Sequence, residues 1–264
     1  MRIKLRSSIR LFMLILISGM ALSLFLANRQ ERASSLPQQK TDLEQQKAEI
    51  DRERRNRAAL PQVDYTAAQL ETERQSEFRK ARAKRHNRRS VPFADMRGDT
   101  TEITRVEDSF VPLRTLPVEE SQVVVVGKIT NAKGYLSEDN SGAYSEYSVQ
   151  VTEVLKGAAK LSGSQIIAER FGAKVVLPKG RTILVWDTDK GIPETGHHYV
   201  LFLKYDPEGD DYSIITGYEL INGRVTPLDR PEPYAIFDGN EEAAFLDLVR
   251  SSIKSVSSNA ENRG

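Results

Sequence analysis

An uncharged stretch of 17 residues, Leu11–Ala27, constrains the fold most, because a segment this apolar has to be removed from water. As a helix it would be about 25 Å long at about 1.5 Å per residue, close to the roughly 30 Å thickness of a bilayer's hydrocarbon core. Four basic residues precede it: Arg2, Lys4, Arg6 and Arg10. The pattern predicts a single-pass membrane anchor at 11–27, with a basic cytoplasmic segment at 1–10 and an exported remainder.

A cleaved signal peptide is the alternative interpretation of the same segment. It would need small residues before the cut, as in Gly19-Met20-Ala21 or Ala21-Leu22-Ser23. The apolar run continues beyond both positions, and Phe25-Leu26-Ala27 places a bulky ring where a small residue is needed. The sequence therefore favours a retained anchor, with the downstream part outside the cytoplasm and in the periplasm if the cell has one.

A charged segment follows, which we expect to be a helical or partly disordered stalk over residues 28–107. Residues 28–90 hold 16 bases and 10 acids, whereas residues 91–264 hold 18 bases and 27 acids. Capping-box patterns at Thr41 and Thr66 predict helices over 41–59 and 66–86. Leu43 and Ile50 are one heptad apart, but Arg57 interrupts a coiled-coil seam. The basic stalk could lie on anionic lipid, contact its own domain or, as we expect, remain solvated.

Seven cations crowd into eleven residues near the end of this stalk: Arg79, Lys80, Arg82, Lys84, Arg85, Arg88 and Arg89. Such a cluster in a cytosolic protein would suggest nucleic acid. Because the segment is expected to be exported, we predict no nucleic-acid partner. We interpret the cluster as a solvated helix end whose cations complement the helix dipole.

The pattern changes to short strands and turns in residues 108–254, which predicts a mainly β domain. Val123–Val126 is typical of a strand buried on both faces, Asn131–Gly142 of a loop, and Tyr144–Leu155 of an alternating strand with a bulge at Val154-Leu155. Further strands are expected at 165–170, 173–177, 181–186, 198–205, 212–220 and 224–228, with turns at 206–210 and at Asn222-Gly223. A C-terminal helix should bury Phe245, Leu248, Val249 and Ile253, followed by a disordered tail at 255–264.

Three segments of this domain resemble a known family: Ser121–Thr130 (SQVVVVGKIT), Tyr147–Gly157 (YSVQVTEVLKG) and Gly196–Lys204 (GHHYVLFLK). They are similar to the OB-fold domains of the netrin and tissue-inhibitor-of-metalloproteinase type, and more specifically to uncharacterised bacterial exported proteins with such a domain. The resemblance covers roughly residues 108–250 and implies an OB-like five-stranded barrel used as a binding platform. The inhibitors' zinc-chelating N-terminal Cys has no counterpart, since this chain has no Cys.

No catalytic, cofactor-binding or metal-binding residue is predicted. His197 and His198 are adjacent and would point to opposite faces of a strand, and His86 lies far away in the stalk. The acidic segments 187–189 and 206–211 lack the spacing of a calcium loop, and no Gly-x-Ser-x-Gly occurs. Six aromatic residues could line a ligand groove, but we expect them to be core residues: Trp186, Tyr199, Phe202, Tyr205, Tyr212 and Tyr218.

These observations favour a membrane-anchored, extracytoplasmic binding module without catalytic activity, whose partner is a protein or an envelope polymer. One alternative is a structural component of the cell envelope that oligomerises through its stalk. A second is an enzyme whose site is dispersed beyond recognisable motifs.

Overall fold

The computed structural model describes residues 46–65, 73–88, 92–93, 102–107, 115–187, 189–229 and 234–261. It contains two units, residues 1–54 and 55–264. In the first unit, residues 46–54 are helical and mostly exposed. Among the described residues, no helix combines the length and apolar character needed to cross a membrane. The predicted anchor at 11–27, like the predicted helix starts at 41 and 66, lies outside the described residues.

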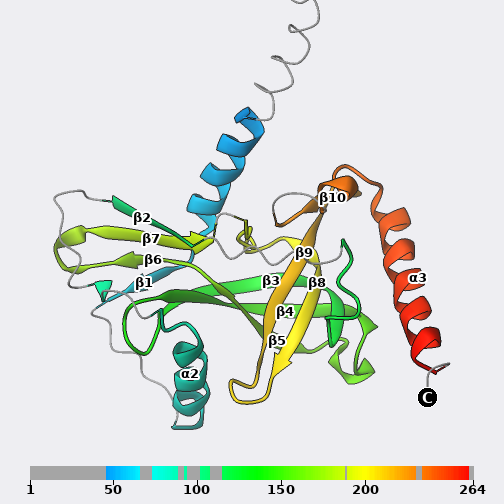
Figure 1. Cartoon of the computed structure of the whole chain (residues 1–264), viewed down its shortest axis with the longest axis horizontal. Helices are drawn as coiled ribbons and strands as arrows, with labels where there is room; N and C mark the ends of the chain where they lie inside the picture. The colour runs from blue at the N-terminus through cyan, green and yellow to red at the C-terminus, as the bar shows by residue number, and fades with distance from the viewer. Residues whose placement is uncertain are drawn as a thin grey trace, which may run out of the picture. The chain divides into compact units, whose positions relative to one another are not determined.

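A closed barrel of five strands forms the centre of the second unit (Figure 1). Its strands are β3 (Val123–Leu136), β4 (Ala143–Lys156), β5 (Gln165–Phe171), β8 (His198–Asp206) and β9 (Asp211–Ile221). The barrel order is β3-β4-β5-β9-β8, and antiparallel pairing of β3 with β8 completes the ring. The mainly β fold predicted from the sequence is confirmed.

Alternation along β3 explains the run Val123–Val126. Val123 and Val125 belong to the barrel interior, with Tyr147, Val149 and Val151 of β4. Val124 and Val126 lie on the outer face, in a cluster with Phe245 and Val249 of the C-terminal helix. The strand is therefore buried on both faces, as predicted.

The β3–β4 hairpin is longer than predicted. Strand β3 continues to Leu136, where the sequence suggested a loop from Asn131, and only Ser137–Gly142 remain as the connection. The predicted bulge is confirmed, because Val125 pairs with Val154 and Val124 pairs with Lys156, which leaves Leu155 unpaired. The Asn222-Gly223 turn is also confirmed, with positive φ at both residues and β10 (Arg224–Pro227) pairing back onto β9.

A second, four-stranded sheet was not predicted as a separate layer. Its order is β1-β6-β7-β2, formed by Gln62–Asp64, Ala173–Val176, Thr182–Asp187 and Glu102–Glu107. Strands β1 and β2 come from the segment expected to be a stalk and pair in parallel with β6 and β7. Val63 of β1 lies in a small core with Val175, Ile183 and Val185. Residues 62–64 and 102–107 thus differ from the predicted stalk and are part of the folded unit.

Two labelled helices accompany the sheets, α2 (Glu73–Arg85) and α3 (Glu242–Glu261). Short 3-10 helices occupy 159–161, 178–180 and 234–237. Helix α3 extends through residues predicted to be a disordered tail from 255. Its serine hydroxyls bond carbonyls one turn back, as Ser257 does to Ile253 at 3.1 Å and Ser258 to Lys254 at 3.0 Å, so that these polar side chains are satisfied within the helix.

Candidate functional site

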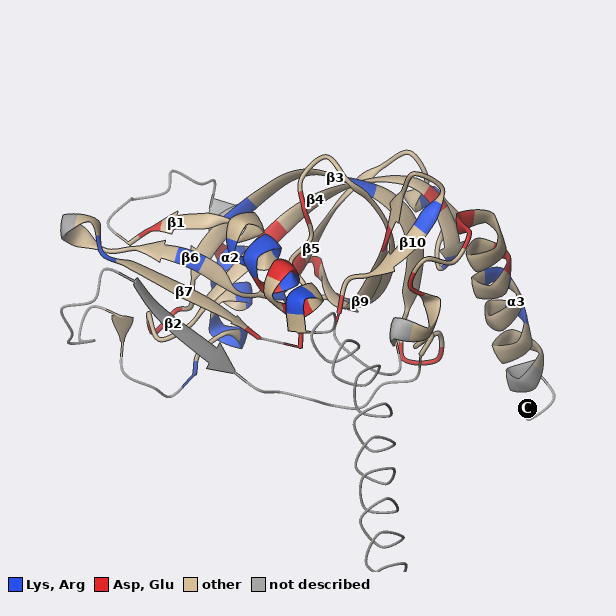
Figure 2. Cartoon of the chain, turned by 90° about the horizontal axis from the view of Figure 1, so that it is seen from above, with Lys and Arg blue, Asp and Glu red and all other residues tan. Residues whose placement is uncertain are grey.

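Part of the basic cluster on helix α2 pairs with the barrel instead of pointing into solvent. Figure 2 shows where the basic positions lie along α2. Arg79, Arg82 and Arg85 are spaced three residues apart and therefore share one side of the helix. Arg82 is buried, whereas the two lysines that alternate with the arginines, Lys80 and Lys84, are exposed. The prediction of a fully solvated helix end is therefore wrong for the arginines and right for these two lysines.

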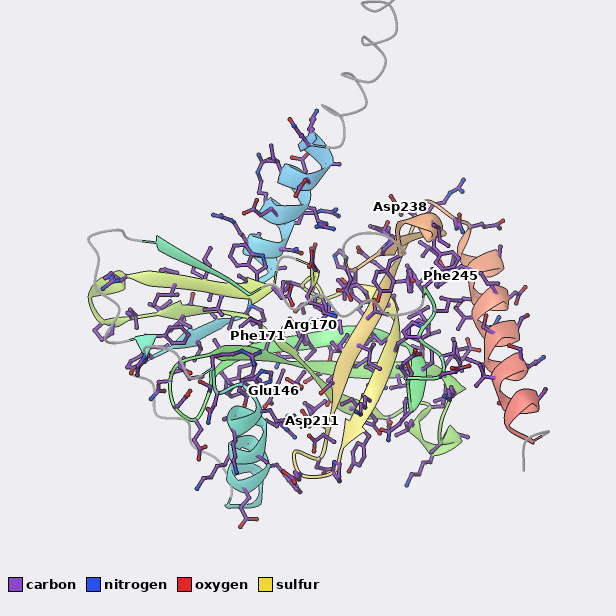
Figure 3. The ribbon with its side chains drawn as sticks, viewed as in Figure 1. Glu146, Arg170, Phe171, Asp211, Asp238 and Phe245 are labelled. Carbon is purple, nitrogen blue, oxygen red and sulfur yellow. The ribbon has the colours of Figure 1, made fainter. Side chains whose placement is uncertain are left out.

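The arginines meet carboxylates from four strands of the barrel, β4, β5, β8 and β9. Arg79 and Arg82 each lie 3.1 Å from a different oxygen of Glu146 on β4. Arg85 places Nη2 at 2.8 Å from both carboxylate oxygens of Asp211 and also pairs with Asp206. Glu146 and Asp211 lie beside α2 in Figure 3. These ion pairs bind residues 73–88 to the barrel, so this part of the predicted stalk also belongs to the folded unit.

Burial governs the acid–base properties of Asp211. Its residue exposure is 0%, and this burial raises its pKa to about 6 in spite of the hydrogen bond from Arg85. Burial alone would lower the pKa of Arg85, but its bond to Asp211 and the charge of Glu169 raise it. The arginine therefore stays charged while the carboxyl can accept a proton in mildly acidic solution.

His86 follows α2 directly. The sequence suggested that it lies far from the β domain, but it contacts that domain. It is buried, stacks on Tyr144 with 4.5 Å between ring centroids, and contacts Oε2 of Glu169 through Nε2. Ser213 donates to the other oxygen of Glu169 at 2.7 Å. Burial would raise the pKa of Glu169, but the bonds from His86 and Ser213 lower it overall. Glu169 is thus held ionised between two neighbours.

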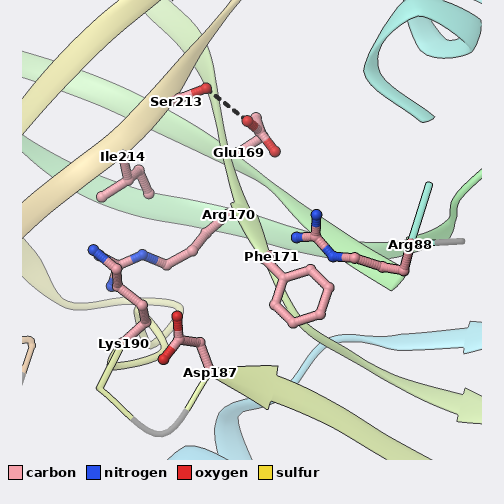
Figure 4. Close-up of a pocket in the computed structure, with 8 residues that line it drawn as sticks. All are labelled: Arg88, Glu169, Arg170, Phe171, Asp187, Lys190, Ser213 and Ile214. Carbon is pink, nitrogen blue, oxygen red and sulfur yellow. Dashed lines mark hydrogen bonds between the residues drawn. The ribbon is translucent and has the colours of Figure 1, made fainter. Parts of the chain in front are cut away.

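A cavity of about 160 Å³ adjoins this network, and Glu169 and Ser213 belong to both (Figure 4). Its walls come from the segment after α2, from β5, from β7 and the loop behind it, and from β9. The lining residues are Arg88, Glu169, Arg170, Phe171, Asp187, Lys190, Ser213 and Ile214. Charged groups from three separate parts of the chain therefore converge on one small space. The guanidinium of Arg88 lies 4.4 Å from the ring centroid of Phe171.

Arg170 is the most firmly held of these groups. Its side chain is 3% exposed and lies 2.7 Å from Asp229, whose own side chain is 2% exposed. It also donates to the carbonyl of Gly191 and, at 3.4 Å, to that of Ile215. Its Nε is buried and has no hydrogen-bond partner in the structure. Asp229 accepts from the Gly191 amide at 3.0 Å as well, which fixes the loop beside the guanidinium.

Lys190 is the second cation on this wall. Its ammonium makes one long hydrogen bond, 3.4 Å, to the carbonyl of Ile215. Burial lowers the pKa of Lys190, and the nearby charge of Arg170 lowers it further, while Asp229 and Asp187 act in the opposite direction. Two partly desolvated cations therefore face the same cavity.

The other residues that the sequence raised for chemistry lie apart from this cavity. His197 contacts Glu219 while the neighbouring His198 is exposed. Within the described ranges, no group of three or more His, Asp and Glu side chains is arranged to hold a metal ion. Most of the aromatic set is core, since Trp186, Tyr199, Phe202 and Tyr218 are buried. Tyr205 and Tyr212 form a partly exposed pair with centroids 5.2 Å apart.

No family model matches the chain, and a search of curated proteins finds no match. The site was missed at the level of sequence because its residues lie between positions 88 and 214 and follow no fixed spacing. The feature of the sequence that could have indicated it is the opposite net charge of residues 28–90 and of the acidic domain. Contact between the two was one of the alternatives considered for the basic stalk.

Proposed function

We propose that this protein is a membrane-anchored, extracytoplasmic binding module without catalytic activity, and that its ligand occupies the cavity between the barrel and the second sheet. The observation that carries the proposal is the convergence of Arg88, Arg170 and Lys190 on one cavity from separate chain segments. Arg170 is held in place by Asp229 and by backbone carbonyls, so the wall is preorganised for recognition. Anchoring through 11–27 rests on the sequence alone, and an intact mass lacking the first 21 to 27 residues would overturn it.

We further assign the barrel to the OB-like class suggested by the sequence resemblance. Five strands in a closed Greek-key ring, with the third and fifth parallel, support this assignment. OB-folds commonly bind ligands on the face of their second and third strands, near the loops that join strands 1–2 and 4–5. In this chain α2 lies over that region, since Arg82 bonds Glu146 of β4 and the carbonyl of Gly209. A ligand site beside this face, and not on it, is consistent with that arrangement.

The order of the polar groups supports binding over catalysis. A serine hydrolase requires an imidazole in contact with the serine hydroxyl, with a carboxylate behind the imidazole. Here Glu169 lies between Ser213 and His86, and its lowered pKa makes it a weak base. The arrangement favours a structural role for the three residues.

Oligomerisation through the stalk is less well supported. The arginines of α2 that could pair helices between chains are engaged with Glu146 and Asp211 of the same chain. An interaction module remains the function that these contacts favour.

The test uses full-length protein extracted in detergent as bait for the envelope fraction. Lys190→Glu reverses a charge at the cavity, and Lys160→Glu makes the same change at an exposed position outside the lining. Wild type and Lys160→Glu should enrich the same ligand, and Lys190→Glu should lose it while keeping the wild-type unfolding temperature. Equal enrichment by Lys190→Glu would remove the cavity from consideration as the binding site.

A further inference from the structure

We infer that the cavity takes a small monocarboxylate, whose oxygens accept hydrogen bonds from Lys190 beside the positive charge of Arg170. This inference rests on the proposed function, because it assumes that the cavity is a ligand site. It is carried by four properties of the lining: its charge balance, its unmet donors, its size and its apolar wall.

The charge balance of the lining matches one negative charge. Three cations, Arg88, Arg170 and Lys190, and two carboxylates, Glu169 and Asp187, leave one formal positive charge. This difference refers to the lining side chains alone; behind them, Asp229 pairs with Arg170, and Arg85 is shared among Glu169, Asp206 and Asp211. A dianion such as phosphate would bring excess negative charge close to two carboxylates.

Unmet donors occur on the cationic wall. Lys190 has three N–H donors but one acceptor in the structure, the distant Ile215 carbonyl. Arg170 contributes charge and no free donor, because its Nη atoms bond Asp229 and the carbonyls of Gly191 and Ile215, and its Nε is buried. Leaving buried donors unpaired is costly, and a carboxylate supplies two oxygens with several lone pairs. Burial is the main cause of the lowered pKa of Lys190, and an anion between the two cations would counter the second cause, which is repulsion from Arg170.

The cavity, which is partly open to solvent, has room for a few heavy atoms. A closed cavity of about 150 Å³ holds one benzene molecule, which has six carbon atoms. The 160 Å³ available here therefore suits a molecule of about four to seven non-hydrogen atoms, such as acetate or lactate.

The remaining wall offers an apolar surface for a short alkyl group. Phe171 and Ile214 line the cavity together with the charged residues. In Figure 4 the Arg170 side chain lies between them, with Ile214 on the side of the guanidinium and Phe171 beside Arg88. The site is thus suited to an anionic head and a small apolar tail.

Calorimetric titration of the full chain in detergent tests the inference with four probes: acetate, lactate, the neutral isostere acetamide, and inorganic phosphate. Acetate and lactate should bind about tenfold more tightly than acetamide, and phosphate should bind more weakly than either carboxylate. Lys190→Met should weaken carboxylate binding about tenfold or more, and Lys160→Met should leave it unchanged. Lys190→Gln removes the charge but keeps a polar side chain. A thermal unfolding scan of this variant shows whether weaker binding comes from the lost charge or from loss of the fold.

Three results would overturn the inference. Acetamide binding as well as acetate would show that charge is not recognised. Phosphate binding more tightly than acetate, with the same dependence on Lys190, would replace the ligand class while the cavity kept its proposed role. Carboxylate binding that is absent, or unaffected in Lys190→Met, would reject the class, and the envelope capture with Lys190→Glu would then decide whether the cavity binds any ligand.

Discussion

At the scale of single residues, the interface between α2 and the barrel is made of charges that are expensive to remove from water. Asp211, Glu146 and Arg82 are all buried, and each has a partner of opposite charge. A buried ion pair adds little net stability compared with apolar packing, but removing one partner leaves an uncompensated charge. The network therefore specifies where α2 docks. Its effect on the free energy of unfolding becomes measurable when one of its residues is replaced.

Replacing Arg82 by Met should lower the free energy of unfolding by about 3 kcal/mol, because Glu146 and Asp211 each lose a cationic partner in a buried setting. Arg79 still pairs with Glu146 and moderates the loss. Lys80→Met, on the exposed side of α2, should change stability by less than about 0.5 kcal/mol. Urea unfolding followed by fluorescence of Trp186, the single tryptophan, measures both. Equal effects of the two substitutions would show that the network is solvated.

Asp211 predicts a specific pH dependence. Its folded-state pKa of about 6 is above the ordinary value near 4, so ionisation opposes folding. Its contribution to stability is complete below about pH 4 and is lost as pH rises through 6. The stability of the wild type relative to Asp211→Asn should accordingly be about 2 kcal/mol greater at pH 4 than at pH 7. A difference that is constant with pH, or that grows toward pH 7, would contradict the assignment.

At the scale of elements, strand and helix positions were largely predictable because they depend on local periodicity. The alternation in β4, the Asn-Gly turn and the four-residue valine run each specify local geometry and were confirmed. Helix α3 shows the limit of such patterns. Its buried side is centred on Phe245, Val249 and Ile253, and Leu248 lies about 100° from that centre at 100° per residue, with 43% exposure. The predicted apolar face was therefore right for three residues and wrong for Leu248.

A matched pair of substitutions in α3 tests this orientation. Phe245 is 1% exposed and packs against Tyr218 and Phe237, with centroids 4.7 and 5.2 Å away. Phe245→Ala should cost about 4 kcal/mol through lost burial and the cavity left behind. Leu248→Ala should cost less than about 1 kcal/mol. Chemical denaturation of both variants gives the comparison, and similar losses would mean that α3 docks with a different face.

Strands β1 and β2 could not have been located from the sequence in the same way. Strand β1 has three residues, too few to display a period, and its partner β6 is more than 100 residues further along the chain. Parallel pairing of this kind depends on tertiary packing, here the burial of Val63 beside Val175 and Ile183. The division into a stalk and a β domain failed at these residues for that reason.

At the scale of the whole molecule, the uneven distribution of charge has a structural counterpart. The basic excess of residues 28–90 is partly neutralised by acids of the barrel through Arg79, Arg82 and Arg85. Composition indicated two oppositely charged regions, but it could not indicate which side chains would meet, since Arg82 and Gly209 are 127 residues apart. The cavity beside this network was invisible to motif reasoning for the same reason.

The central claim, that this cavity is the ligand site, is tested most directly by hydrogen exchange of the full chain with and without saturating lactate. We predict slower exchange of the amides at 189–191 and 213–217, which surround Lys190 and Arg170, with no change in α3. Unchanged exchange at 189–191 and 213–217, or protection confined to other segments, would contradict the claim.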